Sequence, residues 1–99
     1  MKQRIQSINF DATVVLESYI NKKTSKLEKL LDEITNVDVY LKVIKPETST
    51  NKEVEIKISA PGVEFFASKT CDTFEEAIDL SIDALEKQII KFKEKSVKK

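Results

Sequence analysis

The strongest constraint on this chain is a long amphipathic stripe near its C-terminus. Its apolar residues recur at spacings of 4, 4, 3, 4 and 3: Phe74, Ile78, Ile82, Leu85, Ile89 and Phe92. This period indicates a helix with one buried face. The stripe begins at a capping box, in which the Thr73 hydroxyl caps an amide and Glu76 reaches back to the amide of Thr73. The sequence therefore predicts a helix over residues 74–94 that needs an apolar surface to cover.

A second helical period lies in the first third of the chain. Its apolar positions are Leu16, Ile20, Leu27, Leu31 and Ile34, with Leu30 beside them. Thr13 is a suitable N-cap because its hydroxyl can accept a hydrogen bond from an unpaired amide of the first turn. Thr35-Asn36 is a suitable stop, so we predict a helix over residues 13–34.

Four other segments show the period of two that is typical of half-buried strands. They are residues 2–10, 37–44, 53–60 and a strand that continues from Val63. In the first, Ile8 and Phe10 share a face and Ile5 does not, which indicates a bulge or a frayed edge. Residues 45–51 have the composition of a loop, and Pro61-Gly62 is a turn dipeptide that predicts a hairpin.

Length and composition fit one domain built from these elements. The chain has 99 residues with one Gly and two Pro, which favours long elements and short connections. A strand–helix–strand start predicts a parallel pair through a right-handed crossover, and the short connections that follow predict an antiparallel meander. We therefore expect an α+β fold, a two-layer β-α-β-β-β-α domain with a four-stranded mixed sheet and both helices on one face. Residues 1–95 would form this domain, and residues 96–99 a flexible basic tail.

The charges are polarised although 17 basic and 17 acidic residues give a formal net charge of zero. Residues 72–86 hold six acids and no base, whereas residues 87–99 hold six lysines and one glutamate. The helix dipole favours this order at about 0.3–1 kcal/mol per charge, but its effect fades within a turn. Lysines also form stripes on both helices: Lys22, Lys26 and Lys29 on the first, Lys87, Lys91 and Lys95 on the second. Such stripes are expected for contact with a phosphate backbone, with a solvated lysine face as the alternative.

The residues do not indicate an enzyme. The chain has no His, which removes the commonest general base and metal ligand. Cys71 fits a small semi-buried side chain better than a reactive thiol, and Asp79 with Asp83 could share a hard cation only weakly. We expect no cofactor and no metal site. The sequence has no apolar run that could cross a membrane and no signal segment, so we expect a soluble cytoplasmic protein.

The helical segments resemble those of the ribosome hibernation factor family, the group of short hibernation-promoting factors and ribosome-associated inhibitors. In the second helix the matching positions are Asp79, Asp83, Leu85, Glu86, Lys87, Lys91, Lys93 and Lys95. In the first helix they are Thr13, Leu16, Tyr19, Ile20, Lys23, Lys26, Leu27 and Lys29. With the order of the elements, the resemblance covers nearly the whole chain.

The resemblance implies a protein that silences translation without catalysing a reaction. Family members bind the small ribosomal subunit in the channel for messenger and transfer RNA, and they keep the ribosome inactive in stress or stationary phase. They contact ribosomal RNA through basic side chains, which in this sequence would be Lys23, Lys26, Lys29, Lys87, Lys91, Lys93 and Lys95. The implied partners are the small subunit and its RNA, with no membrane and no small-molecule substrate. Off the ribosome we expect a monomer.

Some features depart from the family pattern. Long members carry an extra C-terminal dimerisation domain, whereas this sequence ends at Lys99, so we expect the short form. Glu17 stands where a basic residue is often found. Lys23 lies close to the apolar arc of its helix, so its ammonium would have to snorkel. We expect the acidic stretch of residues 72–86 to face solvent or a ribosomal protein.

Two other functions fit the same residues. One is a general double-stranded RNA-binding module, in which basic helix ends follow phosphates across grooves. The other is a protein-interaction domain that uses the open sheet face, where Tyr40 and Phe66 are expected.

Overall fold

The predicted order of elements is confirmed in the structure, a computed structural model. It describes residues 2–8, 13–31, 33–44 and 50–97, without the side chains of residues 95–97. The elements are β1 (Lys2–Ile8), α1 (Val14–Leu30), β2 (Asn36–Val43), β3 (Lys52–Ala60), β4 (Val63–Cys71) and α2 (Phe74–Val97). The sheet order is β1-β2-β3-β4. The β1–β2 pair is parallel, and the β2–β3 and β3–β4 pairs are antiparallel.

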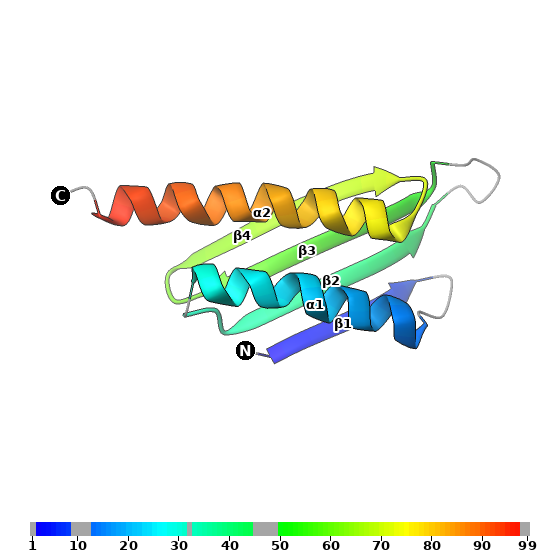
Figure 1. The fold of residues 1–99 in the computed structure, drawn as a ribbon, viewed down its shortest axis with the longest axis horizontal. Coiled ribbons are helices and arrows are strands. Elements are labelled where there is room, and N and C mark those ends of the chain that lie inside the picture. The colour runs from blue at the N-terminus through cyan, green and yellow to red at the C-terminus, as the bar shows by residue number, and fades with distance from the viewer. Residues whose placement is uncertain (1, 9–12, 32, 45–49, 98–99) are drawn as a thin grey trace.

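Both helices cover one face of this sheet, side by side (Figure 1). The predicted two-layer α+β fold with a mixed sheet is therefore correct. The core between the layers takes alternate residues of the strands and one stripe of each helix. Its fully buried side chains include Ile20, Leu27, Val37, Val39, Leu41, Val54, Ile56, Ile58, Ile78, Leu85 and Ile89. Burial of each such side chain contributes about 1.5–3 kcal/mol.

The first helix is shorter than predicted and ends at Leu30, four residues before position 34. Leu31 is extended, although its N–H still bonds to the Leu27 carbonyl at 3.0 Å. The chain must leave the helix early because Thr35, directly before β2, is already bound to β3: its N–H bonds to the Ser59 carbonyl at 2.8 Å. Leu31 and Ile34 are buried as predicted, although both lie beyond the end of the helix.

The first strand presents Ile5 to the core and Ile8 to the open face, where 37% of Ile8 is exposed. Phe10 and residue 9 of the predicted strand lie outside the described residues, as do residues 45–49 of the predicted loop. Gly62 has a φ of +76° in the β3–β4 turn, a backbone conformation that glycine adopts without steric cost.

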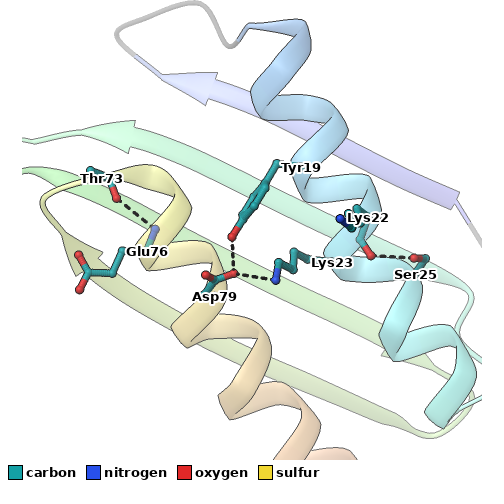
Figure 2. Close-up of polar contacts among 7 residues, drawn as sticks. All are labelled: Tyr19, Lys22, Lys23, Ser25, Thr73, Glu76 and Asp79. Carbon is teal, nitrogen blue, oxygen red and sulfur yellow. Dashed lines mark hydrogen bonds and ion pairs between the residues drawn. The ribbon is translucent and has the colours of Figure 1, made fainter.

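Both predicted N-caps are present. The Thr13 hydroxyl accepts a hydrogen bond from the Leu16 N–H, and the Thr73 hydroxyl accepts one from the Glu76 N–H, each at 3.1 Å. The return half of the predicted capping box is not seen, because the Glu76 carboxylate points away from Thr73 (Figure 2). At its other end α2 continues to Val97, three residues beyond the predicted end and into the predicted tail, whose residues 98–99 are not described.

Candidate nucleic-acid interface

The two helices run in the same direction, so their C-terminal ends point toward the same end of the molecule, where α1 ends near the β3–β4 turn and α2 extends beyond it (Figure 1). The basic halves of both helices are therefore gathered there. The acidic first half of α2 lies toward the opposite end, beside the start of α1. The helical layer therefore has an acidic end and a basic end, although the net charge of the chain is zero.

Four of the predicted contact residues are exposed on this layer and form no ion pair with a described side chain: Lys26, Lys29, Lys87 and Lys91. They come from the second half of α1 and the second half of α2. Their ammonium groups are available to a phosphate backbone, which gains affinity by releasing counterions. The side chain of Lys95, also predicted, lies outside the described residues.

Lys23 is engaged inside the layer. Its Nζ lies 3.3 Å from Asp79 Oδ1 on α2 and 5.3 Å from the centre of the Tyr19 ring. The Tyr19 hydroxyl donates to the same carboxylate oxygen at 2.7 Å (Figure 2). The hydrogen bond to Asp79 raises the pKa of Tyr19 above its ordinary value, helped by burial and by the charge of Asp79. The hydrogen bond and charge of Asp79 also raise the pKa of Lys23. We call Tyr19, Lys23 and Asp79 the interhelical clasp.

Lys93 is engaged at the other end of α1. Its Nζ donates to the carbonyl oxygen of Leu30, the last residue of that helix, at 2.6 Å. The last carbonyls of a helix have no partner within the helix, and a lysine on the neighbouring helix satisfies one of them here. Lys93 therefore ties the end of α1 to α2.

A groove of about 240 Å³ separates the two helices. Its lining residues are Lys23 and Lys26 from α1 and Asp79, Ile82, Asp83 and Glu86 from α2. One wall is basic and the other acidic, so a phosphate inside the groove would meet carboxylates. RNA contact fits the exposed side chains of Lys26, Lys29, Lys87 and Lys91 better than the groove itself, although Lys26 also lines the groove. We call these four residues the outer lysines.

The open sheet face balances its charges internally. Across the strands, Arg4 lies opposite Asp38, which lies opposite Lys57. Lys57 also pairs with Glu64 at 3.5 Å. Further along the same face, beyond Tyr40 and Glu55, Lys42 pairs with Glu53 at 3.8 Å. Opposite charges facing one another leave little unopposed positive potential, so this face suits a phosphate backbone less well than the helices do.

The two aromatic side chains expected on the open face are there, but they do not form one platform. Tyr40 is half-buried on β2 and Phe66 is 53% exposed on β4, with β3 between their strands. Phe66 lies opposite Lys57, and Tyr40 lies opposite Glu55.

The described residues offer little for catalysis or metal binding. Among them, no group of three or more His, Cys, Asp or Glu could hold a metal ion. The sequence offered Asp79 and Asp83 as a weak site for a hard cation, but Asp79 is already bound to Tyr19 and Lys23. Burial raises the pKa of the Cys71 thiol, and the charges of Glu76 and Asp72 raise it further. Among the residues that the structure describes, no helix is long and apolar enough to cross a membrane.

Comparison with known proteins gives the family. Residues 3–97 match the family model described as Sigma 54 modulation protein / S30EA ribosomal protein. The chain belongs to this family. The resemblance to ribosome hibernation factors predicted from the sequence is thereby confirmed.

Known relatives cover between 91% and 100% of this chain. A ribosome hibernation promoting factor of Azotobacter vinelandii is 33% identical over 99 residues, which are 100% of this chain and 89% of the relative. One of Pseudomonas putida is 34% identical over 95 residues, again 89% of the relative. A ribosome hibernation promotion factor of Deinococcus radiodurans is 31% identical over 91 residues, which are 48% of its length.

Solved structures agree with the S30EA fold. A ribosomal subunit interface protein from Coxiella burnetii has a TM-score of 0.83 at 24% identity, over 94% of this chain and 98% of that one. The N-terminal domain of Protein Y from Thermus thermophilus has a TM-score of 0.81 at 24% identity, over 93% and 99%. These likenesses support the fold.

The structure divides the lysines predicted to contact RNA into two groups within this S30EA domain. Lys26, Lys29, Lys87 and Lys91 are exposed on the helical layer, whereas Lys23 and Lys93 bind the neighbouring helix. Sequence reasoning placed Lys23 near the apolar arc of its helix but did not identify Asp79 as its partner. The four-residue spacing of Tyr19 and Lys23, one turn of helix, was the available signal.

Proposed function

We propose that this chain is a ribosome hibernation factor that binds the small ribosomal subunit in the channel for messenger and transfer RNA. It inhibits translation by occlusion during stress or stationary phase, and it acts in the cytoplasm, where ribosomes are. The observation that carries the proposal is the position of Lys26, Lys29, Lys87 and Lys91 in the second halves of two parallel helices, where they are exposed and form no ion pair with a described side chain. Membership of the S30EA family and the names of its relatives support it.

The mechanism follows from charge and shape. Lysines on two parallel helices can neutralise phosphates of two neighbouring stretches of ribosomal RNA, and each neutralised phosphate releases counterions. The acidic first half of α2 is repelled by RNA, so it turns away from the backbone toward solvent or a basic protein. This opposition fixes the orientation of the domain in the channel. No bond is made or broken.

Co-sedimentation with purified small subunits tests the proposal. The wild-type protein should pellet with subunits, and Lys87→Gln/Lys91→Gln should pellet much less at moderate salt. The logarithm of the binding constant should fall with the logarithm of salt, with a slope smaller by about 0.7–0.9 for each lysine removed. Lys42→Gln/Lys57→Gln is the matched control, because it removes the same charge from the open sheet face and should bind like wild type.

Two outcomes would overturn the proposal. One is a wild-type protein that does not pellet with small subunits, and the other is equal loss of binding in the helix variant and the sheet variant. Equal binding to naked duplex RNA and to subunits would instead favour a general double-stranded RNA-binding module. Occlusion is tested separately, since messenger and transfer RNA bound beforehand should compete with the protein.

A further inference from the structure

We infer that Asp79 is a positioning residue, which sets the separation of the two lysine stripes by holding α1 against α2. The inference deepens the proposed function and rests on it, because the stripes matter only if they bind RNA. It assigns Asp79, an acid on one of the two helices that bind the polyanion, a role in favour of binding.

The geometry of the interhelical clasp carries the inference. A single oxygen, Asp79 Oδ1, accepts the Tyr19 hydroxyl at 2.7 Å and lies 3.3 Å from Lys23 Nζ. The lysine also lies over the tyrosine ring, so the three side chains contact one another in a closed set (Figure 2). Tyr19 and Lys23 are one turn apart on α1, and their shared contact fixes both the rotation and the sliding of α1 relative to Asp79.

A second tie lies further along the same pair of helices. Lys93 on α2 donates to the Leu30 carbonyl at the end of α1. The clasp joins the first half and middle of α1 to the first half of α2, and this bond lies at the end of α1, so the two helices are joined at two separated points. A rigid pair is expected to have one spacing between its outer lysines, whereas a single tie would leave a hinge.

This spacing matters because the outer lysines sit on different helices. Lys26 and Lys29 belong to α1, and Lys87 and Lys91 belong to α2. Simultaneous contact with one folded RNA requires the distance between the two stripes to match the RNA. Holding that distance before binding reduces the entropy that binding must overcome. Lys23 and Lys93 therefore act through the other lysines, as ties, and not as phosphate contacts themselves.

Simple electrostatics predicts the opposite effect for Asp79. Removing a negative charge near an RNA interface should strengthen binding, which is the expectation for Asp83, exposed in the same groove. Asp83 forms no ion pair with any described side chain, so it provides a matched control on the same helix. Asp79→Asn and Asp83→Asn change the charge equally, but only Asp79→Asn removes an ion pair and the charged acceptor of the Tyr19 hydroxyl.

The binding experiment uses small ribosomal subunits and a series of salt concentrations. Asp79→Asn should bind about threefold or more weakly than wild type, the scale of a lost ion pair and a weakened hydrogen bond, whereas Asp83→Asn should bind equally or more tightly. Tyr19→Phe changes no charge and should weaken binding in the same direction. Lys23→Gln and Lys93→Gln should leave the salt slope unchanged, whereas Lys26→Gln should reduce it by about 0.7–0.9. Lys23→Arg, which can keep the ion pair, should restore binding.

A measurement on the free protein separates this inference from the proposed function. Spin labels at Ser18→Cys on α1 and Leu80→Cys on α2, both exposed positions, report the interhelical distance in a Cys71→Ser background. Asp79→Asn and Tyr19→Phe should broaden the distance distribution, and Asp83→Asn should not. Unchanged distributions in both clasp variants would overturn the inference, as would equal or tighter subunit binding by Asp79→Asn. If the wild-type protein does not bind subunits while the two clasp variants still show the broadening, the role of Asp79 in RNA binding is overturned together with the proposed function, and only its role in holding the helices remains.

Discussion

Gln88 on α2 makes both backbone hydrogen bonds of Phe66 on the edge strand β4. The Gln88 Nε2 donates to the Phe66 carbonyl at 2.8 Å, and the Phe66 N–H donates to Gln88 Oε1 at 3.4 Å. The Gln88 side chain thus forms the two backbone hydrogen bonds that a neighbouring strand would form at Phe66. Unpaired groups on an edge strand are a template for pairing with another chain. Gln88 therefore protects the β4 edge.

Replacing Gln88 should expose that edge. We expect Gln88→Ala to lower the free energy of unfolding by about 1 kcal/mol, because two partly exposed hydrogen bonds are lost. It should also increase concentration-dependent self-association, measured by sedimentation velocity. Gln88→Glu is the matched variant, since a carboxylate can still accept from the Phe66 N–H but cannot donate to its carbonyl. Equal association by all three proteins would show that Gln88 does not guard the edge.

The two N-caps should contribute similar stability. In each, a threonine hydroxyl accepts the N–H three residues later at 3.1 Å. Thr13→Ala and Thr73→Ala should each lower the free energy of unfolding by about 1 kcal/mol in urea titrations. Thr70→Ala, an exposed threonine of β4, is a control without a cap and should cost less. A loss at only one cap would mean that the other helix start is held by packing alone.

Most of the fold was predictable from local patterns. The caps at Thr13 and Thr73, the alternation of the strands and the stripe from Phe74 to Phe92 each depend on residues a few positions apart. Such signals predict where an element starts and which face it buries. The end of α1 was not predictable in this way, because it depends on a bond from Thr35 to Ser59, which is distant in sequence.

The candidate interface was predictable only in part. Charge spacing identified the exposed lysines of both helices, because those side chains interact with solvent and not with neighbours. The contact of Lys23 with Asp79 and the tie from Lys93 to Leu30 depend on how the two helices pack, and contacts between residues so distant in sequence leave no spacing signal. The same holds for Gln88, whose partner is a backbone on another element.

The contact between β1 and α1 includes a polar pair formed by a buried threonine and a half-buried glutamine. Thr24 is fully buried within the apolar stripe of α1, and its hydroxyl donates to Gln3 Oε1 at 2.9 Å. We expect Thr24→Val to lower the free energy of unfolding by about 1–2 kcal/mol, because the Gln3 amide oxygen loses its donor. Amide hydrogen exchange in β1 should increase. Ser25→Ala removes an exposed hydroxyl of the same helix and should cost less. Equal costs would contradict a specific role for this polar pair.

The interhelical clasp should be sensitive to alkaline pH. The pKa values of Tyr19 and Lys23 are both raised by Asp79, so the folded state holds both protons more tightly than the unfolded state. The stability from the clasp is therefore complete below the ordinary tyrosine pKa of 10.0, and it is lost as pH rises from there through the raised folded-state values. Tyrosinate absorbance measures this directly in a Tyr40→Phe background, where Tyr19 is the remaining tyrosine. In Asp79→Asn, Tyr19 should titrate at lower pH than in the Tyr40→Phe parent. In Asp83→Asn, Tyr19 should titrate at the same pH as in that parent. A common midpoint for all three proteins would mean that Tyr19 does not bind Asp79 in solution.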